Sequence, residues 1–484
     1  MPDSPPPPSA EARAARDAAV QYLLGRINYE KAPAVPYDSR RLKLDRMRAL
    51  LAHLGHPDRG LPIVHIGGTK GKGSTAALVG RILREAGFDV GAYTSPHLQC
   101  IEERFTVNGQ LCPPDELVAL VEEIRPAVLQ MDAEAETTGD RSLRPTFFEL
   151  TTALALLLFR RRKVDLAILE VGLGGRLDST NVCQPAVTAI TSIGYDHTQQ
   201  LGDTLPEIAG EKAGIVKPGV PLVLGPLTSE AREVIAAVAR QRSARIVEPD
   251  ADYRCEFHAP TAQHPWHAGG SVSFSLVAAE RDNLAVERAP LGLRGAHQAA
   301  NAGVALGIVA ELRDQGWLVS HDAVLRGLAR AQLAGRVDVV SQQPLVVLDV
   351  AHNVASATAL ADFFAGAPRN VPKRLVFAAT RDKDVRGIIR TLAPSFDNVW
   401  LTEYHEAARS VPIAELESLW LEATAELPAA AHIVGVTPSP AEAWQAARSA
   451  AESDSIIAVT GSFFLIAELR PLVTGQTGSA ATSA

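Results

Sequence analysis

The chain of 484 residues is predicted to be an α/β protein with two domains. Three observations support this fold class. Short apolar runs alternate with helical patterns, which is typical of a mainly parallel sheet covered by helices. The alternation breaks off between about 250 and 294 and then starts again. The chain is also too long for one ordinary hydrophobic core, so the restart indicates a second domain.

The first alternation predicts a mainly parallel sheet with a small antiparallel appendage. The expected strands are "LPIVHI", "VGAYTS", "VDLAILEV", "AVTAITSI" and "VPLVLG". From about 250 to 294 the pattern becomes short and irregular, and alternating stretches such as "GSVSFSLV" predict antiparallel strands. The expected helices cover about 74–86, 115–131, 146–160, 206–215 and 228–242.

The second alternation predicts another α/β unit. Helices over about 296–315 and 321–332 lead to "AGRVDVV", which places the domain boundary near Ala334–Gly335. The strands "PLVVLDV", "RLVFAA", "NVWLTE" and "SIIAVTGS" follow, with helices expected over 355–366, 384–393, 411–425 and 438–453.

Composition predicts two domains between unstructured ends. Pro5 to Pro8 suggest a solvated tail before a short helix, and "GQTGSAATSA" has the composition of a disordered end. The expected division is therefore a disordered tail over 1–15, an N-terminal domain over 16–334, a C-terminal Rossmann-like domain over 335–473 and a disordered tail over 474–484.

Charge and cysteine usage exclude several classes of protein. A net charge of −8 and a pI near 5.9, without a basic stripe, argue against a nucleic-acid partner. Four cysteines without metal-ligand spacing fit free thiols in a reducing cytoplasm. The run "LTTALALLLF" is expected to be too short to span a bilayer, and the N-terminus lacks the apolar core of a signal peptide. We therefore expect a cytoplasmic protein without a membrane partner.

The stretch "VHIGGTKGKGSTAALVGRILREAG", residues 64–87, joins a predicted strand to a predicted helix through a loop with four glycines. Such a loop can direct backbone N–H groups and the helix dipole at a phosphate. Lys72 can reach phosphate oxygens, and Ser74 or Thr75 can offer a hydroxyl to Mg²⁺. The strict nucleotide-binding pattern is not met because Gly73 separates Lys72 from Ser74, so an ordinary glycine-rich turn is the alternative.

Polar residues follow several apolar runs, where ligands gather in open parallel sheets. Glu170 ends one strand, Asp196 and His197 follow another, Asp349 ends a third, and Thr460–Gly461–Ser462 follow a fourth. An acid such as Glu170 beside a phosphate loop commonly binds a metal or a water. A lone histidine is more often structural, and hard Mg²⁺ prefers oxygen ligands.

Ten motifs in order, from about residue 40 to 470, resemble one family. The chain is similar to the folylpolyglutamate synthases and the related dihydrofolate synthases of the Mur ligase superfamily. The resemblance implies a P-loop-type central ligase domain over 16–334. The motifs are "GGTKGKGST", "YTSPHLQCIEERFTVNG", "TFFEL", "LEVGLGGRLDSTN", "SIGYDHTQQLG…EIAGEKAGIVK", "HQAANAGVAL", "AGRVDVV", "LDVAHN", "RDKD" and "VTGSF".

The resemblance implies an ATP site that draws on both domains. Lys72, His197 and Lys212 are the implied catalytic residues. ATP binding is implied for Gly68, Thr69, Lys70, Gly71, Lys72, Gly73, Ser74, Thr75, Asn301, Arg336, Asp349 and His352.

The resemblance also implies a metal site and a modified lysine. Mg²⁺ is the implied cofactor beside ATP, with K⁺ as a further candidate. Lys212 matches the lysine that this superfamily often carbamylates. The implied metal ligands are Ser74, Ser95, Glu170 and His197.

The implied substrates are a folate or dihydropteroate and L-glutamate, handled by a monomer. ATP would phosphorylate the carboxylate, and the amine of glutamate would then displace phosphate from the acyl phosphate. The chain departs from the family in "YDSRRLKLDRM", where a glycine-containing pterin loop is common, in Val350 of "LDVAHN" and in the approach to Asp382. Folate binding is implied for Thr146, Phe147, Phe148, Glu149, Leu177, Asp178 and Ser179.

Other functions remain open from the sequence. The phosphate loop alone would also fit a small-molecule kinase or ATPase, although neither explains the second α/β domain. A nucleotide-gated binding protein without turnover would not need Lys72, Glu170, His197 and Lys212 together. A Mur-type ligase that acts on another carboxylate is the alternative within the superfamily.

Overall fold

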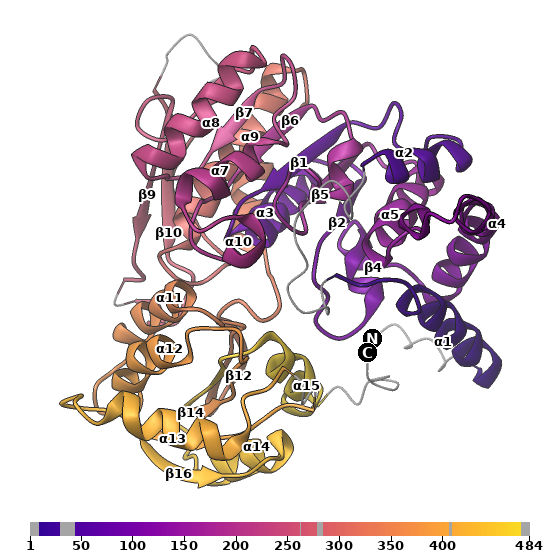
Figure 1. Cartoon of the computed structure of the whole chain (residues 1–484). Coiled ribbons are helices and arrows are strands. Elements are labelled where there is room, and N and C mark those ends of the chain that lie inside the picture. The colour runs from indigo at the N-terminus through magenta and orange to yellow at the C-terminus, as the bar shows by residue number, and fades with distance from the viewer. Residues whose placement is uncertain (1–8, 30–43, 262, 278–283, 406–408, 476–484) are drawn as a thin grey trace.

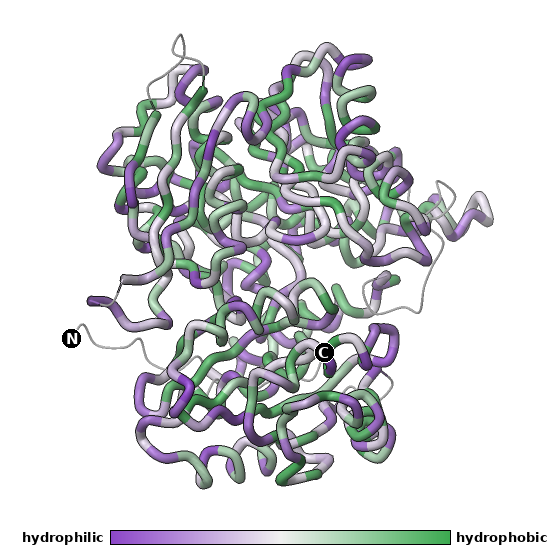
Figure 2. Tube along the Cα trace, turned by 90° about the vertical axis from the view of Figure 1, so that its left-hand side faces the viewer, coloured by the Kyte–Doolittle hydropathy of each residue, from purple (hydrophilic) through white to green (hydrophobic). Residues whose placement is uncertain are grey.

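The computed structural model describes residues 9–29, 44–261, 263–277, 284–405 and 409–475 and confirms the α/β class. Figure 1 shows a larger N-terminal part, which ends with α10 (His321–Arg330), above a smaller C-terminal part, which begins at β12 (Asp338–Gln342). The expected boundary at Ala334–Gly335 falls in the segment between these two elements. Figure 2 shows hydrophobic segments concentrated inside both parts.

The N-terminal sheet has eight strands in the order β4-β3-β2-β5-β1-β6-β7-β8. It is parallel from β2 to β8, and only β3 and β4 run antiparallel to their neighbours. The central strand β1 therefore ends at the same edge as β5 and β6. The strands are β1 (Ile63–Gly67), β2 (Val90–Tyr93), β3 (Phe105–Val107), β4 (Gln110–Leu111), β5 (Leu166–Glu170), β6 (Val187–Ile190), β7 (Leu222–Leu224) and β8 (Ile246–Val247).

Helices cover both faces of this sheet, so every residue of β1 is buried. Val64 and Ile66 pack with α3, α9 and α10 on one face, whereas Ile63 packs with α1, α2, α4 and α5 on the other. The helices are α1 (Ala10–Leu24), α2 (Leu44–His53), α3 (Lys72–Glu85), α4 (Pro114–Thr138), α5 (Phe147–Arg162), α6 (Thr198–Leu201), α7 (Leu205–Ala213), α8 (Ser229–Gln241) and α9 (Gln298–Asp314). In the part of the chain that the structure describes, 3₁₀ turns lie at Ile101–Arg104 (η1), Arg141–Leu143 (η2), Ser179–Val182 (η3) and, in the C-terminal domain, Ala393–Ser395 (η4).

Helix α5 is buried over most of its length. Among the described residues, the stretch Arg141–Arg162 is long and apolar enough to cross a membrane by length and composition alone, which corrects the expectation that its apolar run is too short. However, 78% of its most apolar window is buried inside the protein, where α5 contacts α4, β2 and β3. It therefore serves as a core helix of the N-terminal domain.

The expected antiparallel appendage is present as the sheet β11-β10-β9, formed by β9 (Tyr253–His258), β10 (Ser271–Leu276) and β11 (Ala285–Pro290). The connection between β9 and β10 reaches the C-terminal domain. There the Trp266 ring lies 5.1 Å from the Phe363 ring and 6.2 Å from the Phe364 ring of α11 (Val354–Ala365). This aromatic contact links the domains, besides the chain itself.

The C-terminal sheet has six strands in the order β12-β13-β17-β14-β15-β16, and only the edge strand β12 is antiparallel. Its strands after β12 are β13 (Leu345–Leu348), β14 (Lys373–Phe377), β15 (Asn398–Leu401), β16 (His432–Val436) and β17 (Ile456–Thr460). The helices after α11 are α12 (Val385–Leu392), α13 (Ile413–Thr424), α14 (Pro440–Ser449) and α15 (Phe463–Thr474).

The chain ends differ in part from the expectation. Helix α1 begins at Ala10, inside the segment 1–15 predicted as a disordered tail, because the Ser9 side chain caps its first turn. Helix α15 ends at Thr474, where the tail 474–484 was expected to begin, and residues 476–484 lie outside the described residues. Most of the loop in "YDSRRLKLDRM" also lies outside them, up to residue 43.

Candidate active site

A cavity of about 2540 Å³ is lined by residues of both domains. Its walls include the segments that follow β1, β5 and β6 in one sheet and β13, β14 and β17 in the other. Ligands of open α/β sheets bind at such carboxyl ends of strands. The cavity is larger than an ordinary single-ligand pocket, so it has room for several reactants together.

The phosphate loop lies at the centre of this cavity. Lys70 N donates to Ser192 Oγ at 2.9 Å, and Thr191 Oγ1 donates to Lys70 O at 2.6 Å, so the chain after β6 holds the loop in place. Gly71 has a φ of 86°, and a Cβ there would lie 2.0 Å from Asn301 Oδ1. Among the described side chains, none caps the N-terminus of α3, which leaves its first N–H groups available to an anion.

Two lysines converge on the carbonyl of Gly68. Lys72 Nζ and Lys212 Nζ each donate to Gly68 O at 3.1 Å. Lys212 comes from α7 and is only 5% exposed. Burial, with the nearby charge of Lys72, lowers the pKa of Lys212 to about 7. A large share of Lys212 is therefore a neutral amine at physiological pH, unlike an ordinary lysine.

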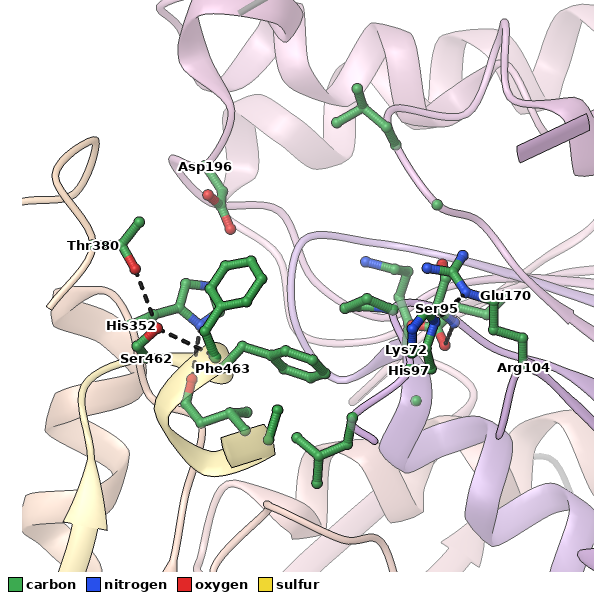
Figure 3. Close-up of a pocket in the computed structure, with 18 of the residues that line it drawn as sticks. Lys72, Ser95, His97, Arg104, Glu170, Asp196, His352, Thr380, Ser462 and Phe463 are labelled. Carbon is green, nitrogen blue, oxygen red and sulfur yellow. Dashed lines mark hydrogen bonds between the residues drawn. The ribbon is translucent and has the colours of Figure 1, made fainter. Parts of the chain in front are cut away.

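Glu170 and Ser95 lie together beside the start of α3. Ser95 N donates to Glu170 Oε2 at 3.3 Å, and that oxygen lies 3.7 Å from where a Cβ on Gly73 would be. Burial raises the pKa of Glu170, although Lys72 opposes the rise. Figure 3 shows Glu170, Ser95 and Lys72 on one side of the pocket. A buried carboxylate at this place is suited to a cation.

The C-terminal domain contributes a second group of polar residues. Asp349, at the end of β13, accepts from Val337 N at 2.7 Å and from Ala351 N at 2.8 Å. His352 Nδ1 lies 2.8 Å from Val350 O, and a carbonyl only accepts, so Nδ1 carries the proton. The bare Nε2 of His352 then accepts from Lys70 Nζ at 3.3 Å, across the domain boundary.

Asp196 joins the two domains by charge. Its carboxylate lies 2.7 Å from Lys70 Nζ of the phosphate loop and 3.5 Å from Lys383 Nζ of the C-terminal domain. Burial opposes ionisation, but Lys70, His197 and Lys383 hold the pKa of Asp196 well below its usual range. His197 Nε2 lies 3.9 Å from Asp196, and burial lowers the pKa of His197 to about 4. The structure thus places His197 beside Asp196.

The expected folate-binding residues form another wall. Glu149 accepts from Arg46 Nε at 2.7 Å and from Thr146 N at 2.8 Å, and both Arg46 and Glu149 are buried. Through these hydrogen bonds the buried Glu149 links α2 to the start of α5. Phe148 lines the cavity, whereas Phe147 packs into the core with the Arg104 guanidinium over its ring at 5.1 Å.

Most of the residues that the sequence singled out line this one cavity. The lining residues are Thr69, Lys70, Gly71, Lys72, Gly73, Ser74, Ser95, Thr146, Phe148, Glu149, Glu170, Leu177, Asp178, Ser179, His197, Asn301, Arg336, Asp349 and His352. Gly68, Thr75, Phe147 and Lys212 do not line it, and all four are buried.

Several lining residues carry chemistry that the sequence alone did not assign. Tyr404 Oη donates to Thr380 Oγ1 at 3.0 Å, and Thr380 Oγ1 lies 3.3 Å from Ser462 Oγ. Figure 3 shows Thr380, Ser462 and His352 facing Lys72 and Glu170 across the pocket. Ser462 was singled out by its place after β17, and the same rule for strand ends could have found Thr380, which follows β14.

A divalent cation fits the Glu170 side of this cavity. Glu170 and Ser74 offer oxygen ligands, which Mg²⁺ prefers. The part of the chain that the structure describes contains no group of three His, Cys, Asp or Glu side chains arranged to hold a metal. Any cation there would therefore share its ligands with bound phosphates and water, as Mg²⁺ does in nucleotide sites.

Comparison with known proteins places this fold and cavity in a class. Residues 66–309 match the Mur ligase middle domain, and residues 335–463 match the Mur ligase glutamate ligase domain. The two domains and the cleft between them are therefore those of a Mur ligase.

Full-length relatives narrow the class. The chain is 35% identical to the dihydrofolate synthase/folylpolyglutamate synthase of Bacillus subtilis, over 93% of this chain and 97% of the relative. It superposes on the Mycobacterium tuberculosis folylpolyglutamate synthase complexed with ADP and AMPPCP with a TM-score of 0.82, at 28% identity over 97% and 100% of the two chains. For the Escherichia coli FolC in complex with DHPP and ADP, the TM-score is 0.77 at 30% identity over 96% and 99%. This chain belongs to the dihydrofolate synthase/folylpolyglutamate synthase family.

Proposed function

We propose that this chain is an ATP-dependent ligase that joins L-glutamate to the terminal carboxylate of a reduced folate through an acyl phosphate, with release of ADP and phosphate. The observation that carries the proposal is the single cavity, where a phosphate loop on one domain faces a polar cluster on the other. Relatives over nearly the whole chain bear the names of this activity, and related structures hold ADP or AMPPCP.

In this proposal the two domains bind different parts of ATP. The open N-terminus of α3 and Lys72 hold the phosphates, while Asn301, Arg336, Asp349 and His352 hold the rest of the nucleotide. Phosphoryl transfer needs positioning and charge neutralisation more than covalent chemistry, and Lys72 and Arg336 supply positive charge. Asp196 holds Lys70 and Lys383 on either side of the domain boundary, so it aligns the two halves of the site.

The acceptor carboxylate lies, in this proposal, between the phosphate loop and the wall formed by Thr146, Phe148 and Asp178. Its oxygen attacks the γ-phosphate, and the amine of glutamate then displaces the phosphate from the acyl carbon. Thr380, Tyr404 and Ser462 offer hydroxyl groups for the incoming amino acid from the C-terminal side. Reactants that fill this cavity would keep water away from the acyl phosphate, which protects it from hydrolysis.

Glu170, Ser95 and Ser74 are proposed to hold Mg²⁺, with His197 as a further ligand and K⁺ as a second candidate cation. The bound Mg²⁺ would offset the negative charge of the phosphates. Lys212 is proposed to be carbamylated: its neutral amine adds to CO₂, one proton leaves the nitrogen, and the side chain becomes a carbamate anion. An anion beneath the phosphate loop would attract cations that an ammonium repels.

The carbamate hypothesis is tested at low CO₂. Activity lost in CO₂-depleted buffer should return with bicarbonate, and a small carboxylate should restore part of the activity of Lys212→Ala. Activity that is indifferent to bicarbonate would reject the modification.

The acyl phosphate is tested with oxygen-18 in the terminal carboxylate of the folate. The proposal expects one labelled oxygen in the released phosphate for each amide formed, together with ADP. An ATPase would take that oxygen from water, and a kinase would give a stable phosphorylated product without glutamate incorporation. Unlabelled phosphate would show that the proposed mechanism is wrong.

Conversion of dihydropteroate to dihydrofolate is proposed as a second reaction at the same site, because the Bacillus subtilis relative bears both names and the chemistry of its carboxylate is the same. A screen of dihydropteroate and tetrahydrofolate, each with glutamate and ATP, measures it. ADP release that depends on both dihydropteroate and glutamate is the expected result.

We further propose that the enzyme acts in the cytoplasm as a monomer. Light scattering of the purified protein tests the oligomeric state.

A further inference from the structure

A fully buried histidine lies in the strand that leads into the phosphate loop. His65 belongs to β1 and is 0% exposed, and burial lowers its pKa to about 3. Its Nε2 lies 2.8 Å from Thr180 Oγ1, and its Nδ1 has no partner among the described residues. A neutral imidazole with one unpartnered nitrogen is a costly choice for a core strand, where an apolar side chain would pack as well. Packing alone therefore does not explain why a histidine occupies this position of β1.

The direction of the hydrogen bonds follows from their chemistry. Thr180 Oγ1 lies 2.5 Å from Asp178 Oδ1, and an ionised carboxylate only accepts, so the single hydroxyl hydrogen of Thr180 goes to Asp178. Thr180 Oγ1 must then accept from His65, which places the imidazole hydrogen on Nε2 and leaves Nδ1 as a bare lone pair. The three residues form a one-way chain from His65 through Thr180 to Asp178.

Asp178 is the end of this chain that faces the cavity. Its Oδ2 accepts from Gly172 N and Leu173 N, each at 3.0 Å, and its Oδ1 also accepts from Thr180 N at 3.0 Å. Burial raises the pKa of Asp178, and these hydrogen bonds oppose the rise. Donors that polarise one another strengthen the bond at the end of a chain. The hydroxyl of Thr180, backed by His65, thus helps to keep the carboxylate fixed and ionised.

We propose that His65 and Thr180 are positioning residues for Asp178, and that the three form a relay which fixes the loop from Gly172 to Ser179 as a wall of the pterin pocket. The inference rests on the proposed function, in which Asp178 faces the pterin. The four donors that Asp178 already receives occupy the lone pairs of its carboxylate, so this side chain acts by holding the backbone of the loop in place against the pterin. The relay also connects the pterin wall to β1, the strand that carries the phosphate loop.

The test uses two pairs of variants in the full-length chain. Thr180→Val removes the hydroxyl and Thr180→Ser retains it, while His65→Leu removes the donor and His65→Gln retains an N–H at the end of the side chain. Thr188→Val is the matched control. Thr188 is fully buried on β6, lies opposite His65 in register, and its Oγ1 has no partner among the described residues.

The expected result is a selective change in the pterin substrate. Thr180→Val should raise the KM for tetrahydrofolate or dihydropteroate about tenfold or more, the loss expected for a hydrogen bond to a charged group. The KM for ATP should stay within about twofold, since the phosphate loop keeps its own contacts. Thr180→Ser and His65→Gln should recover most of the loss, and Thr188→Val should resemble the parent enzyme.

A double-mutant cycle separates the relay from a merely structural role. In an Asp178→Asn background, Thr180→Val should raise the KM for the pterin substrate no further, because the carboxylate that it positions is gone. Equal rises in both KM values, or a Thr180→Val variant that behaves like Thr188→Val, would overturn the relay. If Asp178→Asn itself leaves the pterin KM unchanged, the pterin assignment is wrong and the relay falls with it. If His65→Leu fails to fold, the Thr180 variants still show whether the relay positions Asp178.

Discussion

Replacement of Lys212 by Met is expected to stabilise the protein while it removes turnover. Lys212 is 5% exposed, and its pKa is lowered from 10.5 to about 7. Below its ordinary pKa the unfolded chain binds a proton that the folded chain gives up, so the folded state pays a penalty that an apolar side chain avoids. Met has a similar shape, and the carbonyl of Gly68 that Lys212 contacts keeps its bond from Lys72.

The size of the effect depends on pH. Linkage between the two pKa values gives a penalty of about 4 kcal/mol at pH 7 and about 2 kcal/mol at pH 9. Because the folded state binds fewer protons than the unfolded state between about pH 7 and 10.5, the stability of the parent protein rises with pH through this window. The advantage of Lys212→Met should therefore shrink as the pH rises.

Urea denaturation in CO₂-free buffer at pH 7, 8 and 9 measures this difference for the N-terminal domain. Lys163→Met is the control, because Lys163 is exposed and its replacement should change the stability by less than about 0.5 kcal/mol. A Lys212→Met protein less stable than the parent at pH 7, or an advantage that stays constant up to pH 9, would refute the reasoning.

Three further outcomes are expected. Lys72→Ala should keep the fold by circular dichroism and lower kcat by about 10² or more in a coupled ADP assay; undiminished activity would reject its assignment. Gly71→Ala would place a Cβ 2.0 Å from Asn301 Oδ1 and should raise the KM for ATP far more than that for folate, and an unchanged KM would contradict the role of this glycine. Arg46→Met leaves the buried charge of Glu149 without its partner and should destabilise the protein by about 3–5 kcal/mol in urea denaturation. The double variant Arg46→Met with Glu149→Leu should recover most of this loss of stability. An equal loss in the double variant would argue against the ion pair.

The sequence predicted those parts of the site that depend on local pattern. Glu170 was found because it ends a buried strand and the phosphate loop because it follows one, and parallel strands bring their ends to one edge. Strand β16 was missed because it is an edge strand whose alternate residues are exposed, so His432–Val436 has no continuous apolar run. Local pattern therefore predicts central strands better than edge strands.

Contacts between distant segments were beyond the reach of sequence pattern. Asp196 was singled out by its place after β6, but its pairing with Lys383 depends on how two separate domains sit together. Phe147 and Phe148 are neighbours at the start of α5, yet only Phe148 faces the cavity, because the direction of the helix axis decides which ring turns inward. Such placements follow from packing in three dimensions.

The Trp266 contact constrains how the cleft can open. Trp266 packs against α11, the chain between α10 and β12 joins the domains again, and Leu98 packs with the apolar core of the C-terminal domain. Separation of the domains would expose the apolar side chains of Trp266 and Leu98, so a rotation that keeps them packed costs less free energy than one that uncovers them. The pairs of Asp196 with Lys383 and of Lys70 with His352 lie within the cleft, so each opening would have to break them. Entry of a substrate and departure of a product would thus require the same rotation of one domain against the other.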